Sequence, residues 1–160
     1  MIKRPYRGAL KRLRPSAVRE RILQQQRAMF SRLDDLLAAV SALAADLPLA
    51  LDQTRALALS IRRELLRNLA LEAKILMPAL RRADAWGETR AQTLEERHRV
   101  RRVELAALLD VLVRADPASL VRDLRQFVVT RKADMTQVQR NDLAPGVLRD
   151  DVTGVDVNGG

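Results

Sequence analysis

The chain has 160 residues, of which 48% are hydrophobic and only 2% aromatic, and it carries a formal net charge of +9 without any cysteine. This length predicts a single domain with an aliphatic core. The composition excludes disulfide bonds and thiolate metal sites, and no apolar run is long enough to span a membrane. No apolar signal segment follows the basic N-terminus, so we expect a cytoplasmic location.

The positive charge is concentrated at the start of the chain. Residues 1–15 contain no acidic side chain, whereas the remainder is nearly balanced. We expect these residues to form a flexible basic arm that either keeps the chain soluble or contacts nucleic acid, anionic lipid or an acidic protein. The candidate anion-binding side chains of this arm are Lys3, Arg4, Arg7, Lys11, Arg12 and Arg14.

Two long helices are predicted in the first half of the chain. Apolar residues recur at alternating steps of three and four over residues 16–46, a spacing typical of a helix with one buried face. Ser16 is the expected N-cap of this helix, and Pro48 closes the segment. The same spacing predicts a second helix over residues 49–77, which Pro78 kinks or ends.

Two further helices are predicted in the second half. A loop over residues 83–88 contains Trp86, which we expect to cover an end of the core. The third helix follows over residues 88–114, with Val100 and Val103 widening its buried side. Asp116 as N-cap and Pro117 at the first helical position then start a fourth helix that ends near Asn141. Pro145 and Gly146 stop it, and residues 147–160 are expected to form a loosely ordered tail.

Four amphipathic helices with short connections predict an all-α fold, an antiparallel up-down-up-down four-helix bundle over residues 16–146. Polar side chains interrupt the buried faces of the first three helices. In an antiparallel bundle these positions fall at one depth, so the sequence predicts a polar layer at one end of the core. Its members are Gln26, Asn68, Glu72, His98, Met135 and Gln139.

Four segments of the sequence resemble the helices of hemerythrin-like (HHE cation-binding) domains. They are "IRERILQQQRAMFSRLDDLL", "LLRNLALEAKILMPAL", "LEERHRVRRVELAALLDVL" and "QFVVTRKADMTQVQRNDLAPGVL". The resemblance implies a site for a non-haem di-iron centre, often used for oxygen binding or sensing. Family members have histidines at the positions of Gln26, Asn68, His98 and Met135. They have a bridging carboxylate at the position of Glu72 and another carboxylate near Gln139 or Arg140.

Only Glu72 and His98 of this implied ligand set remain, and two ligands do not hold two iron ions. The sequence therefore predicts a vestigial site with no metal and no cofactor. A carboxylate in the core needs a partner, and Arg102, Arg131 and His98 are the candidates for Glu72. We expect Gln26 and Asn68 to join the same hydrogen-bonded network.

The sequence contains no catalytic motif and only one histidine, so we expect a protein that is not an enzyme. A hemerythrin-like bundle without metal would act as a regulatory or protein-interaction module, with another protein or a second copy of the chain as partner. One alternative is a residual metal-responsive or oxygen-responsive protein that uses Glu72 and His98. Another is nucleic-acid or anionic-surface binding through the arm, whose affinity would fall steeply with salt.

Overall fold

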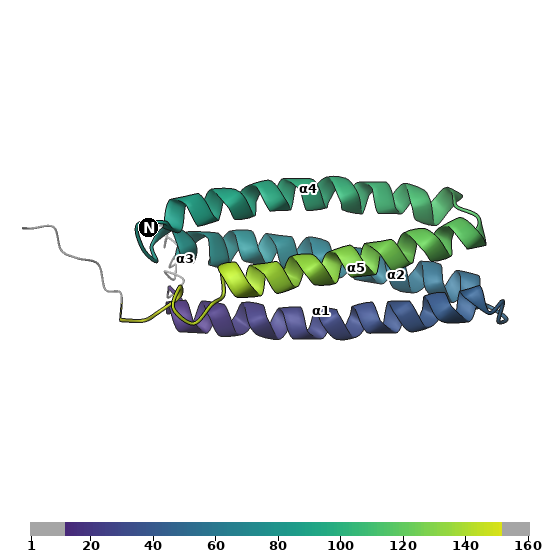
Figure 1. The fold of residues 1–160 in the computed structure, drawn as a ribbon, viewed down its shortest axis with the longest axis horizontal. Coiled ribbons are helices and arrows are strands. Elements are labelled where there is room, and N and C mark those ends of the chain that lie inside the picture. Colours follow the sequence, from purple (N-terminus) through teal and green to yellow (C-terminus); the bar gives the residue numbers. More distant parts are fainter. Residues whose placement is uncertain (1–11, 152–160) are drawn as a thin grey trace, which may run out of the picture.

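The computed structural model describes residues 12–151, and every regular element in that part of the chain is a helix (Figure 1). The all-α prediction is therefore confirmed. Within these residues no helix combines the length and the apolar character that crossing a membrane requires. The remaining arm residues 1–11 and tail residues 152–160 lie outside the described part. The elements in chain order are α1 (Pro15–Ala44), α2 (Ala50–Leu71), the π-helical turn η1 (Glu72–Leu76), α3 (Met77–Arg81), α4 (Gly87–Arg114) and α5 (Pro117–Asn141).

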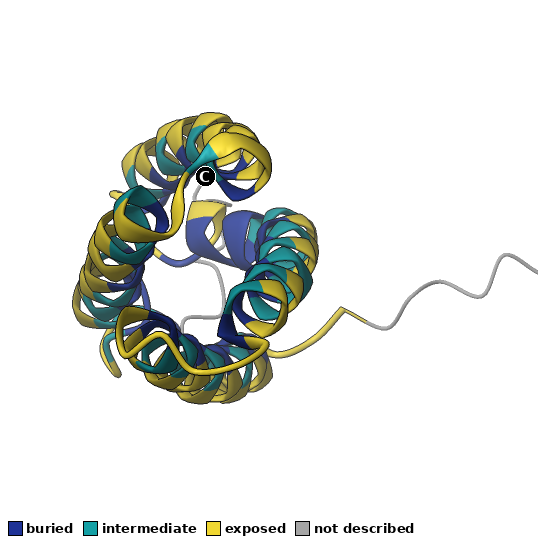
Figure 2. Ribbon diagram, turned by 90° about the vertical axis from the view of Figure 1, so that its right-hand side faces the viewer, coloured by how far each residue is buried: buried dark blue, intermediate teal, exposed yellow. Residues whose placement is uncertain are grey.

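The helices form a bundle around a shared interior. Because α2, η1 and α3 follow one another without a break, the described residues contain four long helical segments. Helix α1 packs against both α2 and α5, and α4 packs against α2 and α3. Seen along the bundle in Figure 2, the buried sides of the helices face one another and the exposed sides face outward. This arrangement follows from the amphipathic spacing of the sequence.

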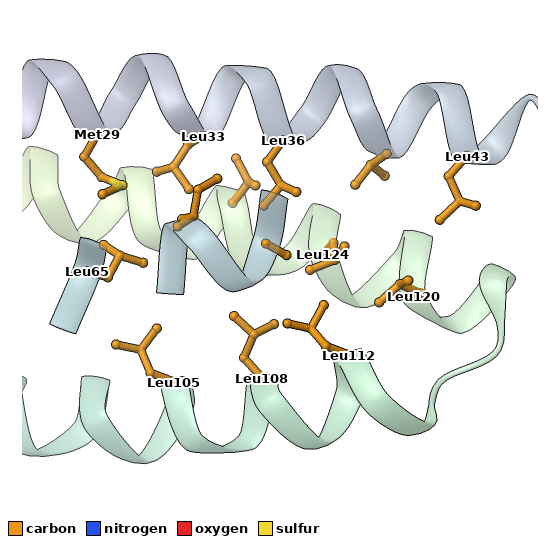
Figure 3. Close-up of a cluster of buried hydrophobic side chains, with 14 of the residues drawn as sticks. Met29, Leu33, Leu36, Leu43, Leu65, Leu105, Leu108, Leu112, Leu120 and Leu124 are labelled. Carbon is orange, nitrogen blue, oxygen red and sulfur yellow. The ribbon is translucent and has the colours of Figure 1, made fainter. Parts of the chain in front are cut away.

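The interior consists of two apolar clusters with a polar layer between them. The larger cluster is drawn in Figure 3, where leucines from all four long segments point toward one another. Burying one such leucine contributes about 1.5–3 kcal/mol. The smaller cluster includes Ile22, Leu80 and Leu94. The polar residues thus lie between two apolar clusters and not at one end of the core as predicted, because α3 and residues 143–148 supply apolar side chains beyond them.

The start of α1 is capped by a residue from the far end of the sequence. Arg14 occupies the N-cap position without a side-chain hydrogen bond, so the prediction of Ser16 as cap is wrong. Instead the backbone N–H and the hydroxyl of Ser16 donate to the Asp150 carboxylate, at 3.0 and 2.7 Å. These hydrogen bonds lower the pKa of Asp150. Because Leu148 is also buried, the chain stays packed against α1 as far as Asp150.

Pro78 does not end the second helix, because a π-helical turn precedes it. The N–H of Met77 bonds to the carbonyl of Glu72, five residues earlier, and the helix continues to Arg81. A proline in a regular α-helix clashes with the carbonyl four residues before it, and a wider turn relieves such a conflict. The wider turn also shifts the buried face, so that Leu76 is buried and Ile75 only half-buried.

Two expectations for the third helix and the turn before it are wrong. Trp86 is 68% exposed and does not cover the core. Its backbone N–H donates to the Asp84 carboxylate. Val103 is 62% exposed, and Val100 is exposed as well, because the buried face of α4 points to the opposite side. The start of the fourth helix is confirmed, since Asp116 accepts a hydrogen bond from the backbone N–H of Ser119.

Gly87 allows the start of α4 to pack directly against α3. A Cβ atom at this position would lie 2.1 Å from the carbonyl oxygen of Leu80. We therefore expect Gly87→Ala to lower the free energy of unfolding by about 1–3 kcal/mol, because backbone must move to relieve the overlap. Gly146→Ala is the matched control, since no heavy atom lies within 4 Å of a Cβ there. Urea unfolding measures both variants, and equal stability of the two would contradict the close approach.

Candidate functional site

The polar layer is built around a buried carboxylate and the only histidine of the chain. Glu72 opens the π-helical turn η1, and His98 lies on the buried face of α4. The Nε2 atom of His98 lies 2.7 Å from Oε2 of Glu72, and both residues are almost fully buried. With its proton on Nε2, the imidazole donates to the carboxylate, so Glu72 has the partner that a buried charge requires. Of the partners expected for Glu72, His98 is the one in contact.

Two buried arginines complete the layer and connect α4 to α5. Arg101 of α4 places Nη1 3.6 Å from Oε2 of Glu72 and Nε 3.3 Å from Oδ2 of Asp134 on α5. Arg131 of α5 bonds to Asp134, at 3.0 Å, and also reaches back to Glu104 of α4. Arg101 and Arg131 are only 7% and 4% exposed. Each helix of this pair therefore contributes an arginine and an acceptor to the other.

A small cavity lies inside the layer. Its volume is about 20 Å³, and residues from α1, α2, η1, α4 and α5 line it. This volume has room for about one or two water molecules and for no larger substrate. Neither polar atom of the Gln26 side chain has a hydrogen-bond partner among residues 12–151, and the same holds for Nη2 of Arg101 and Nε of Arg131. The expectation that Gln26 joins the network around Glu72 is therefore wrong. The unpaired polar groups that line the cavity make it suitable for water.

The residues singled out from the sequence are distributed unevenly over this layer. Gln26, Asn68, Glu72 and Met135 all line the cavity. His98 instead borders an outer groove between α4 and the η1–α3 segment. The half-buried Gln139 is absent from the lining.

Sequence reasoning did not identify Arg101 as a partner of Glu72, although its spacing from Leu94, His98 and Leu105 placed it on the buried side of α4. Arg131 was considered as a partner of Glu72, but it binds Glu104 and Asp134 instead. Arg102, another predicted partner, is exposed. The sequence did contain a signal for this ion pair. Arg101 recurs at the spacing of buried residues, and a buried arginine needs a carboxylate beside it.

Burial changes the acid–base properties of two groups near the layer. It lowers the pKa of the Arg131 guanidinium, and the carboxylates of Asp134 and Glu104 oppose that change. Burial also raises the pKa of the Asp142 carboxyl, against the opposing effect of Arg97, whose Nη1 lies 3.6 Å from Oδ2 of Asp142. Asp142 is 4% exposed. Its carboxylate form is therefore destabilised in the folded protein.

The side chains of the layer form ion pairs with one another and do not make a ligand set for a metal. Among the described residues, no group of three or more His, Cys, Asp or Glu side chains is arranged to hold a metal ion. The guanidinium of Arg101 lies between Glu72 and Asp134, where it neutralises both carboxylates. The Glu72–His98 pair is buried, and the cavity beside Glu72 admits nothing larger than water.

Comparison of the chain with protein-family models, with curated proteins and with solved structures finds no match.

The ion pairs of Arg101 should contribute strongly to stability. Arg101→Met removes one partner each from Glu72 and Asp134, and we expect the free energy of unfolding to fall by about 3 kcal/mol. The neighbouring Arg102→Met is the control, because Arg102 is exposed and forms no ion pair with a described residue; a change within about 0.5 kcal/mol is expected there. Urea titration measures the free energy of unfolding of both variants. If Arg101→Met is more stable than the parent, the cost of desolvating Arg101 outweighs its ion pairs.

Asp142 should make stability depend on pH. Its pKa is raised by burial, so the folded chain keeps this proton to a higher pH than the unfolded chain. The contribution of Asp142 to stability is therefore largest below the ordinary aspartate pKa and is lost as the pH rises through the raised value. We expect Asp142→Asn to be more stable than the parent by about 1 kcal/mol near neutral pH, with the difference shrinking in acid.

Asp110→Asn, at an exposed position of α4, is the control for this pH dependence. Thermal unfolding followed at several pH values measures the three proteins. A lower stability of Asp142→Asn at neutral pH would show that pairing with Arg97 outweighs burial.

Proposed function

We propose that this protein is a metal-free, hemerythrin-like bundle that acts as a protein-interaction or regulatory module. The single observation that supports this most is the position of Arg101. Its guanidinium contacts Glu72, the residue that the family resemblance places at a bridging carboxylate, and Asp134. A fixed positive charge at that place repels a metal cation and takes up the oxygen atoms that would coordinate it.

The connections between the helices support the up-down-up-down order that forms part of this proposal. Residues 45–49, 82–86 and 115–116 link consecutive long segments. Connections as short as these favour antiparallel neighbours. The packing of α1 against both α2 and α5 agrees with that order, since the first and last helices of such a bundle are neighbours.

A binding role fits the described residues better than catalysis does. The Glu72–His98 pair is almost fully buried, and the internal cavity of about 20 Å³ beside Glu72 has no room for a substrate. The outer faces of the helices, by contrast, carry exposed valines, among them Val113 on α4 and Val129 on α5 at 70% and 62% exposure. These outer faces, and not the interior, are the surfaces that another protein or a second copy of the chain would contact. A cytoplasmic location belongs to the same proposal.

Elemental analysis tests the absence of metal directly. We expect protein purified without chelator to contain far less than one iron per chain, and added Fe²⁺ to leave the unfolding temperature unchanged, because Arg101 neutralises the carboxylates. A residual metal-responsive protein would instead contain stoichiometric iron, and His98→Ala would abolish its stabilisation by iron. Either of those two results would overturn the proposal.

A further inference from the structure

A groove with an unusual lining lies on the outside of the bundle, between the start of α1 and the η1–α3 segment. Its volume is about 480 Å³, within the range of ligand-binding clefts. Leu71, Ile75 and Pro78 form part of its apolar lining, and all three are only half-buried. The groove is distinct from the internal polar layer, with which it shares no lining residue.

Among the described residues, four cations and no acidic residue line this groove: Arg12, Arg21, Lys74 and Arg82. All four side chains are exposed, and none forms an ion pair or hydrogen bond with another side chain of residues 12–151. Elsewhere on the surface some arginines are paired with a neighbouring acid, as Arg99 is with Glu96 and Arg122 with Asp123. The groove therefore has a positive potential that the described chain does not neutralise.

The π-helical turn η1 places two of the lining residues. Glu72, at the start of this turn, points into the core, whereas Lys74 and Ile75 of the same turn line the groove. π-helical turns are rare and frequently occur at functional sites. Here the turn presents a cation and an apolar side chain together on the outer surface.

We propose that this groove binds a segment of a partner protein that carries both acidic and apolar side chains. The inference rests on the proposed interaction role and identifies the chemistry of the partner. Apolar side chains of the segment would cover Leu71, Ile75 and Pro78, and its carboxylates would pair with the surrounding cations. Nucleic acid fits this lining less well, because its phosphates do not cover apolar side chains and no described lining residue is an aromatic one on which a base could stack. A flat membrane surface does not reach into a concave groove.

Fluorescence anisotropy with the full chain tests this proposal. The probe is a short labelled peptide in which glutamate and leucine alternate. We expect it to bind at low salt and to be released as salt is added, because exposed charges are screened within about 10 Å at 0.1 M ionic strength. A peptide with glutamine in place of glutamate should bind much more weakly. NMR titration should place the largest shift changes at Lys74 and Ile75.

Paired charge reversals separate the groove from the overall charge of the protein. We expect Arg21→Glu combined with Lys74→Glu to weaken peptide binding by about tenfold or more. Arg114→Glu combined with Arg125→Glu is the matched control, because it changes the net charge equally at the last residue of α4 and in the first half of α5, neither of which lines the groove. This control should change the affinity for the peptide by less than about twofold, because salt screens charges that are far from the groove. Circular dichroism verifies that both variants keep their helices.

Three outcomes would overturn the proposal. Equal weakening by the two double variants would show attraction to net charge alone. The second outcome is that duplex DNA or phosphatidylserine vesicles bind more tightly than the peptide. If the Arg21/Lys74 reversal abolishes that binding, the groove belongs to those ligands. If the acidic peptide shows no measurable binding, the proposed chemistry of the partner is wrong. The iron analysis would still decide separately whether the bundle is metal-free.

Discussion

An ionised carboxylate in an aliphatic interior has to be neutralised, and this constraint at Glu72 organises the middle of the bundle. The side chain is 4% exposed and is satisfied by His98 and Arg101, both from α4. Arg101 is itself a buried charge, so it needs Asp134 of α5, which in turn bonds to Arg131. One buried carboxylate thus requires matching positions on three helical segments, and a shift of any of them along the bundle would leave a charge unpaired.

The course of the helices was largely predictable from the sequence, because spacings of three and four between apolar residues depend only on local geometry. The cap at Asp116 was predictable for the same reason, since its partner Ser119 is three residues away. The acceptor at the start of α1 was not, because Asp150 is 134 residues from Ser16. The passage of the helix through Pro78 depends on a π-helical turn, which no short-range pattern indicates.

The candidate site shows the same division between local and long-range information. That Glu72 and His98 meet followed from helix order and from their positions within each helix, and the structure places them in contact. Which arginine joins them did not follow. Arg101 and Arg102 are adjacent in sequence, but the rotation of α4 buries one and exposes the other. The spacing of Arg101 along α4 already placed it on the buried side, but the carboxylates that it reaches, Glu72 and Asp134, depend on how α4 packs against its neighbours.

The interior and the outer surface are linked through a single turn of helix. Glu72 at the beginning of η1 is fixed by His98 and Arg101, while Lys74 and Ile75 of the same five-residue turn line the outer groove. The turn cannot rotate without moving both sets of side chains, because a packed interior has few alternative arrangements. The ion pairs of the polar layer therefore also hold the cation and the apolar side chain of the groove in place. In this way a layer with no room for a substrate can still contribute to binding at the surface.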